Sequence, residues 1–284
     1  MSKKLSGEKR KIQMQSKNKY PNIKKDIKPA IILYTEGEKT EPIYFDYLKK
    51  YCDDLIIHIY GCGYNTKSLV CKAKSEMKDH LTRKDKERIE EYFQEVTDHQ
   101  NIHKKTGIIY QQVWCVFDAD SFNESYQDAI ILAKKNNFFS AISNQSFELW
   151  LYLHQAALSS RIYRKDFESK LTTYYGIKYD KSDNIIKQFF EEFFKYGENG
   201  YIDRVQKAIE HAFQMEKEES IRDGNISCNI CHEKSSYNCY NCSPYTTVHY
   251  LVMVILYQLI GDKYKKIVDK HFKIPSRNRY KNTV

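Results

Sequence analysis

Three acidic residues stand directly after runs of apolar residues, where a parallel sheet would bring them together. Glu36 follows the apolar run Ala30–Tyr34, and Asp118 and Asp120 follow the run Tyr110–Phe117. Because residues i and i+2 of an extended chain point to the same side, Asp118 and Asp120 can bind one ion together. Carboxylate oxygens are the ligands that Mg²⁺ and Mn²⁺ prefer. Such an ion neutralises phosphate charge and activates water, so the three acids predict a site for phosphodiester chemistry.

Each of these acids also has a purely structural explanation when it is taken alone. Glu36 fits an ordinary turn, while Asp118 and Asp120 fit helix caps or a solvated loop. Glu148, which follows the next predicted strand, could complement the positive end of a helix. For any one acid alone the structural explanation is favoured, but their shared position at strand ends favours the functional interpretation.

Two Cys-x-x-Cys pairs, separated by seven residues, form a second candidate metal site: Cys228, Cys231, Cys239 and Cys242. Four thiolates are typical of a structural, tetrahedral Zn²⁺ site, and an iron–sulfur cluster is the alternative. The first pair, with the histidine that follows, also spells the attachment motif of c-type haem. That interpretation needs export and leaves the second pair unexplained, so we set it aside. A closed four-cysteine site predicts a structural role or a partner surface.

The elements that must position these residues alternate between strands and helices. Apolar runs predict strands at 30–34, 55–60, 110–117 and 138–142. Helices are expected from residue 41, with Thr40 as its cap, and at about 68–79, 85–97, 126–136 and 147–158. This alternation predicts a parallel sheet with helices on both faces. In such sheets, reactive groups collect beyond the carboxyl ends of the strands.

The chain divides into four parts on this basis. We expect a basic disordered tail at 1–28, an α/β core at 29–158, a helical region at 159–265 and a basic C-terminal tail at 266–284. The helical region is predicted to contain helices near 163–174, 183–195, 201–219 and 245–261, with the cysteine loop inserted at 226–243.

The positive charge is concentrated in the first 28 residues. This segment has ten Lys or Arg against two acids, so it carries +8 of the net charge of +9. One interpretation is a solvated tail that aids solubility. The other is an arm that attracts nucleic-acid phosphates without regard to sequence.

Several classes of protein are excluded or disfavoured by the sequence. No apolar run reaches the roughly 18 residues that a membrane span needs, and the polar N-terminus is unlike a signal peptide. A cytoplasmic location is therefore expected, in which cysteines are thiols or metal ligands. A Gly-rich phosphate-binding loop of the Walker type is absent, so the sequence gives no support to ATP hydrolysis.

Four blocks of this sequence resemble those of the RloB-like family. The first runs from Glu36 through Pro42 to Phe45 and reads EGEKTEPIYF, and the second is WCVFDAD, ending at Asp120. The third combines Ala141–Asn144 with Phe147–Leu151 and His154, and the fourth is 244–252, which includes His249. Together they span most of the chain, and their order makes the resemblance specific.

The resemblance implies a fold and a set of site residues. The family is similar to TOPRIM domains in its Glu and Asp-x-Asp arrangement, which implies a TOPRIM-like sheet. It implies Glu36, Asp118 and Asp120 as ligands of Mg²⁺ or Mn²⁺, with Glu148 as a further catalytic acid. Glu38, Lys39 and His249 match the family blocks and are candidates for substrate contact. His249 would equally fit a half-buried polar position on an amphipathic helix.

The resemblance also implies a role in bacterial anti-phage defence, often beside an ATPase partner subunit. Two functions stay open. The first is a metal-dependent nuclease that acts on DNA or RNA, including tRNA. The second is a non-catalytic sensor or binding subunit that keeps the TOPRIM-like scaffold and docks on the ATPase. Retention of the acids favours the nuclease.

Overall fold

A computed structural model describes residues 28–92, 100–119, 124–144, 146–158, 164–195, 200–223 and 245–272. Asp120 and the four cysteines of the predicted zinc site lie outside these residues. The same is true of 1–27 and 273–284, which make up most of the two predicted basic tails.

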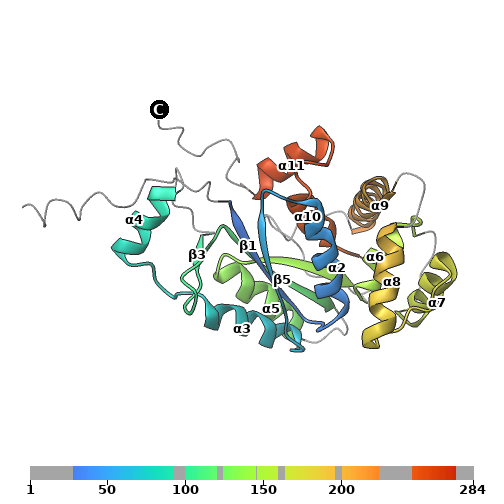
Figure 1. The fold of residues 1–284 in the computed structure, drawn as a ribbon, viewed down its shortest axis with the longest axis horizontal. Helices are drawn as coiled ribbons and strands as arrows, with labels where there is room; N and C mark the ends of the chain where they lie inside the picture. The colour runs from blue at the N-terminus through green and yellow to red at the C-terminus, as the bar shows by residue number, and fades with distance from the viewer. Residues whose placement is uncertain are drawn as a thin grey trace, which may run out of the picture.

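Four parallel strands form the central sheet, in the order β2-β1-β5-β6 (Figure 1). They are β2 (Ile56–Gly61), β1 (Ala30–Thr35), β5 (Gln112–Ala119) and β6 (Phe139–Asn144). Leu33 of β1 is in register with Ile59 on one side and Trp114 on the other. All six residues of β1 are buried, as expected for an inner strand of a sheet covered on both faces. The predicted parallel α/β sheet is therefore confirmed.

Alternate residues of the strands build two separate cores. Ile32 and Tyr34 of β1 face a cluster with α3 (Thr66–Glu76) and α5 (Glu124–Lys135). Ile31 and Leu33 face the larger cluster, which includes α2 (Thr40–Leu48), α6 (Glu148–Leu153) and α10 (Val248–Ile255). This division follows from the two-residue period of a strand. Helices on both faces hold the sheet, so the ends of its strands are fixed in place.

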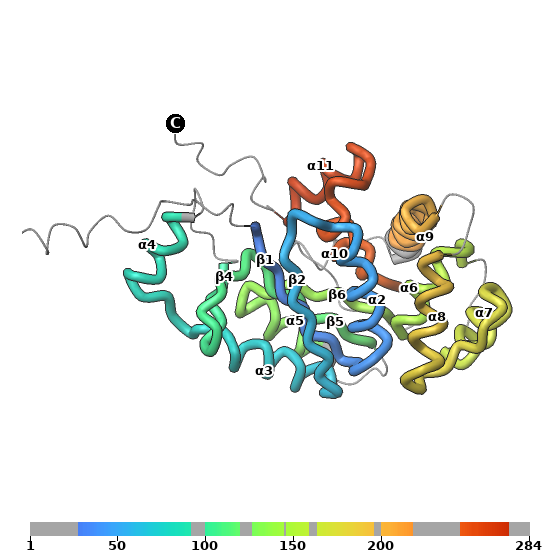
Figure 2. Tube along the Cα trace, viewed as in Figure 1, coloured from blue at the N-terminus to red at the C-terminus, as the bar shows by residue number. Residues whose placement is uncertain are grey.

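The helical region lies at the end of the molecule away from α4 (Arg83–Tyr92), as Figure 2 shows. It consists of α7 (Arg164–Tyr175), α8 (Asp183–Lys195) and α9 (Gly200–Asp223), close to the predicted helices. Phe190, Phe193 and Phe194 of α8 pack around Tyr44 of α2, with ring centroids 5.6–6.2 Å apart. This aromatic packing joins the helical region to the sheet domain.

The C-terminal part differs from the prediction. The expected single helix at 245–261 is wrong, because α10 ends at Ile255 and a second helix, α11 (Asp262–Phe272), follows. Residues 266–272 therefore belong to a helix rather than to a basic tail. Tyr264, Val268 and Phe272 recur every four residues and are buried. Their burial outweighs the lysines between them, because those can stay in solvent while the apolar stripe packs on the core.

Three local predictions also need correction. Thr40 does not cap α2: the helix begins at Thr40, and the preceding Lys39 makes no capping hydrogen bond through its side chain. Instead, Thr40 is turned inward and buried. The predicted strand at 110–117 is split by Gln111 into β4 (Ile109–Tyr110) and β5, and β4 pairs with β3 (Asn101–Ile102) in a small hairpin. The predicted helix at 147–158 is limited to the short α6. Among the described residues, no helix has the length and apolar character needed to cross a membrane.

Candidate functional site

Glu36 and Asp118 are brought together at the carboxyl edge of the sheet. The backbone amide of Glu36 donates to the Val116 carbonyl at 2.9 Å, and the Glu36 carbonyl accepts from Gly63 at 3.0 Å. The residue is thus fixed between β5 and the loop after β2. One carboxylate oxygen of Glu36 accepts from the backbone amide of Asp118 at 3.2 Å, and the Thr66 hydroxyl lies 3.4 Å from the same oxygen. Two of the three predicted metal ligands are therefore neighbours.

The third predicted ligand, Asp120, lies outside the described residues. Within the part of the chain that the structure describes, no group of three or more His, Cys, Asp or Glu side chains is arranged to hold a metal ion. The described edge therefore places two of the predicted ligand residues, Glu36 and Asp118, close together, and among the described residues they do not form a complete coordination shell.

A tight turn places a further carboxylate, that of Glu41, against Gly37, the residue that follows Glu36. A Cβ atom at Gly37 would lie 2.0 Å from an oxygen of Glu41, so only glycine allows this close approach. Glu41 is only 5% exposed. Its pKa is raised above the ordinary value, chiefly by burial and also by the negative charge of Glu148. A buried carboxyl that binds its proton more firmly than usual is typical of functional sites.

Glu148 is buried at the start of α6 and is held by two partners. The Tyr179 hydroxyl donates to its Oε1 at 2.6 Å, and the Lys181 ammonium lies 2.8 Å from the same oxygen. Burial by itself would raise the pKa of Glu148, but Lys181 and Tyr179 lower it below the usual value. Glu148 is therefore ionised, whereas Glu41 resists ionisation. The two neighbouring carboxyls therefore have pKa values shifted in opposite directions, each by its own surroundings.

Two cations from the helical region complete the cluster. Arg164, the first residue of α7, has its Nη2 atom 3.8 Å from a carboxylate oxygen of Asp118. Burial lowers the pKa of Lys181, but Glu148, and more weakly Asp118, raise it overall. Both cations are about half exposed, at 48% and 46% of their side chains. They can therefore exchange a carboxylate partner for an anionic group of a ligand.

Glu38 and Lys39 lie at the exposed rim of the same loop. Glu38 packs against Gly61, the last residue of β2, and against Gly63: a Cβ atom at Gly63 would lie 2.5 Å from its Oε1. The Lys39 ammonium lies 2.7 Å from Asp183, the first residue of α8. Both side chains are open to solvent, where they are accessible to a ligand.

The segment before α10 extends the sheet beyond β6. Thr247 donates its backbone amide to the Ile142 carbonyl at 2.8 Å, and the Ile142 amide donates to the Thr247 hydroxyl at 2.8 Å. The Asn144 amide donates to Tyr245 at 2.6 Å. The fourth family block is thus held by hydrogen bonds at the carboxyl end of β6. Although it is distant in sequence, it lies at the same edge of the sheet as Glu36 and Asp118.

His249 is fully buried on α10. Its ring packs on Phe213 of α9, with centroids 4.7 Å apart, and its Nε2 atom lies 3.6 Å from Glu216. Burial lowers the pKa of His249 to about 3, so the ring is neutral near pH 7. His249 therefore packs in the interior of the protein, against α9. Its contact with a substrate stays a prediction.

Sequence reasoning missed Glu41, Arg164, Tyr179 and Lys181. Glu41 stands in the first family block, but next to Pro42 it fits the first turn of a helix, which hides its contact with Gly37. The other three lie more than 100 residues from Glu36, outside all four blocks. Only the tertiary packing of α7 and α8 brings them to the sheet edge.

These features define a class: a doubly covered parallel α/β protein with a charged site at the carboxyl ends of its strands. The family model described as RloB-like protein matches residues 31–255. The chain belongs to the RloB-like family. Comparison with curated proteins gave no match, and neither did comparison with solved structures.

The raised pKa of Glu41 leads to a testable pH dependence. A carboxyl with a raised pKa stabilises the folded chain at low pH, and this contribution is lost as the pH rises through the folded-state pKa. Glutamine has no carboxyl to ionise, so the Glu41→Gln variant does not lose this contribution. We therefore expect the free energy of unfolding of Glu41→Gln, minus that of the unaltered chain, to increase as the pH is raised from about 4 to about 7. Urea denaturation at several pH values measures this difference. The exposed Glu168→Gln is the control and should show a flat difference; a flat or falling curve for Glu41→Gln would contradict the assignment.

Proposed function

We propose that this chain is a divalent-metal-dependent nuclease with a TOPRIM-like site, which cleaves the phosphodiester bonds of DNA or RNA, tRNA included, in bacterial anti-phage defence. The observation that carries the proposal is the contact between the Glu36 carboxylate and Asp118 at the carboxyl edge of the sheet. Membership of the RloB-like family, whose first two blocks contain these residues, supports it.

Mg²⁺ or Mn²⁺ would be held by Glu36, Asp118 and Asp120. The two described ligands fit such an ion because they offer hard oxygen donors in a half-buried position. When bound, the ion supplies charge neutralisation at the phosphate and activation of water. Glu148 contributes beside it by holding Lys181, at 2.8 Å, in a fixed position.

The cations of the site would bind the phosphodiester backbone. Arg164 and Lys181 are half exposed and stand directly beside the acids, so a phosphate at the metal would lie within their reach. Lys39 at the rim and the basic segment 1–28 would add contacts to neighbouring phosphates that do not depend on sequence. Glu38 is exposed at the same rim and would face the substrate. His249, which is buried, would act through its neighbours.

The alternative is a non-catalytic sensor or binding subunit that docks on an ATPase partner. One observation favours it: Arg164 and Lys181 already balance the charges of Asp118 and Glu148. A site whose acids are neutralised by its own side chains can keep its shape without an ion. In this case the cations would serve a structural purpose, and the chain would contribute binding rather than cleavage.

Direct assays of cleavage separate the two functions. The purified chain is incubated with plasmid DNA, single-stranded DNA, total RNA and tRNA, with Mg²⁺ or Mn²⁺, alone and with the ATPase encoded beside it. The nuclease proposal expects cleavage of at least one substrate, which EDTA abolishes. If no nucleic acid is cut under any of these conditions, the nuclease proposal fails and the sensor alternative is favoured.

The cysteine residues Cys228, Cys231, Cys239 and Cys242, which lie outside the described residues, are proposed to bind structural Zn²⁺. We expect the purified protein to be colourless and to contain zinc by elemental analysis. The double substitution Cys228→Ser with Cys231→Ser should remove the zinc, because two of four thiolates are lost. Cys71→Ser, which alters an exposed free thiol, is the matched control and should leave the zinc in place. A brown, iron-containing preparation would contradict the zinc assignment.

A further inference from the structure

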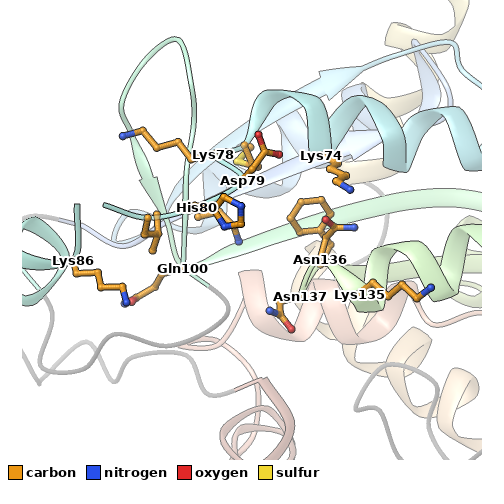
Figure 3. Close-up of a pocket in the computed structure, with 13 residues that line it drawn as sticks. Lys74, Lys78, Asp79, His80, Lys86, Gln100, Lys135, Asn136 and Asn137 are labelled. Carbon is orange, nitrogen blue, oxygen red and sulfur yellow. The ribbon is translucent and has the colours of Figure 1, made fainter. Parts of the chain in front are cut away.

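A cavity of about 490 Å³ lies at the edge of the sheet opposite to the acids. It is lined by the end of α3, the residues around the start of α4 and the turn between α5 and β6 (Figure 3). Phe138, which lines it, directly precedes β6, whereas Asp118 lies toward the other end of the neighbouring strand. A six-residue strand spans about 20 Å at about 3.3 Å per residue, so this cavity is separate from the site described above.

The cavity carries an excess of positive charge. Lys74, Lys86 and Lys135 line it and are exposed to solvent. In the described part of the chain, these three ammonium groups form no ion pair. The other charged groups are already neutralised: the Lys78 ammonium lies 2.8 Å from Asp85, and Asp79 lies 3.1 Å from Lys104. Three cations therefore remain for an anionic ligand, and lysine binds phosphate as a point charge.

Neutral polar groups and apolar surface accompany the lysines. Asn136 and Asn137 lie at one side of the cavity, Lys86 and Gln100 at the other, and His80 between them (Figure 3). Asn136 donates its side-chain amide to the Leu132 carbonyl at 2.7 Å, which fixes its orientation. Asn137 adopts the left-handed conformation, with φ of 56°, which turns the chain sharply after α5. Such amides can hydrogen-bond the polar edge of a planar ring, next to the apolar side chains that also line the cavity.

We propose that this cavity binds a nucleoside phosphate. Its volume lies within the range of small-molecule sites, about 300–1,000 Å³, and exceeds what a single phosphate ion fills. The positive charge of the three lysines, which lie on different sides of the cavity, would attract the phosphate groups, and Asn136, Asn137 and Gln100 would contact the sugar or base. The site is independent of the proposed nuclease activity, because it uses none of the residues at the carboxyl edge.

Equilibrium binding with charge-matched variants tests the proposal. Isothermal titration calorimetry measures the affinity of the full chain for AMP, ADP and orthophosphate, in buffer without added Mg²⁺ or Mn²⁺, so that no catalytic divalent ion contributes and the proposed structural Zn²⁺ stays in place. The cavity variant combines Lys86→Glu with Lys135→Glu. The control combines Lys84→Glu with Lys134→Glu, which reverses the same number of charges at neighbouring exposed positions of the same two helices, α4 and α5. Thermal melting of both variants shows whether they fold like the unaltered chain.

We expect AMP or ADP to bind the unaltered chain and the control with similar affinity, and the cavity variant to bind about tenfold more weakly or worse, because two charge-assisted contacts are replaced by repulsion. Orthophosphate should bind more weakly than either nucleotide. Equal affinities of the two variants would place binding elsewhere and overturn the proposal. So would the absence of nucleotide binding, or orthophosphate binding as tightly as the nucleotides.

Discussion

Under the proposed nuclease function, replacement of Asp118 by Ala is expected to reduce metal-dependent cleavage about a thousandfold, since loss of a proposed ligand of the catalytic ion would remove several kcal/mol of transition-state stabilisation. The same substitution should leave the fold intact. Asp118 stands at the edge of the sheet, and its pairing with Arg164, at 3.8 Å, is loose. We expect less than about 1 kcal/mol of lost stability from a pair of this kind. Initial rates of cleavage at saturating Mn²⁺ measure the effect.

The control for this substitution is Asp203→Ala, which removes an exposed acid from α9 and should cleave at the unaltered rate. Circular dichroism and thermal melting verify that both variants are folded. If folded Asp118→Ala cuts as fast as Asp203→Ala, Asp118 is not a ligand of the catalytic ion, and the nuclease site must lie elsewhere.

Replacement of Lys181 by Met is expected to have the largest effect on stability among single changes at the site. The ammonium of Lys181 holds Glu148, whose side chain is only 3% exposed. Removal of Lys181 leaves a buried carboxylate without its positive partner, although the Tyr179 hydroxyl still donates to it. The free energy of unfolding should fall by about 1–3 kcal/mol at neutral pH. The loss is not larger because Lys181 is half exposed, so solvent screens its attraction to Glu148. Urea denaturation measures the loss.

The pH dependence of the same substitution identifies Glu148 as the group responsible. In the unaltered chain the pKa of Glu148 is lowered, so its contribution to stability is present above the unfolded pKa and is lost as the pH falls through the folded pKa. Without Lys181, burial should dominate and raise that pKa. The loss in the Lys181→Met variant should therefore shrink as the pH falls and Glu148 becomes protonated. Lys187→Met, at an exposed position of α8, is the control; a loss that does not depend on pH would contradict this account.

The parallel sheet could be predicted from the sequence because its strands are short apolar runs that alternate with amphipathic helices. The position of Glu36 and Asp118 at one edge follows from the same pattern, because strand ends in a parallel sheet share an edge. The exact beginning of α2 could not be predicted. Thr40 has the side chain of a typical cap, but its burial among contacts distant in sequence determines where it points.

The charged partners of the acids could not be predicted for a related reason. Arg164 and Lys181 belong to segments with many charged residues of both signs, in which no single charge stands out. Their roles depend on how α7 and α8 pack through the aromatic residues around Tyr44. The helix α11 was not predicted for a similar reason. Its many lysines made the segment look like a basic tail, although the burial of Val268 and Phe272 stabilises it as a helix.

Binding of Mn²⁺ to the purified protein, measured by electron paramagnetic resonance, tests the proposed metal site without a cleavage assay. We expect the unaltered chain to bind Mn²⁺. Glu36→Gln and Asp118→Asn keep the shape of each side chain but remove its charge, and each should weaken binding about tenfold or more. Asp203→Asn should bind like the unaltered chain. If both amide variants bind Mn²⁺ as tightly as Asp203→Asn, the carboxylates of Glu36 and Asp118 do not hold the metal, and the proposed metal site is wrong.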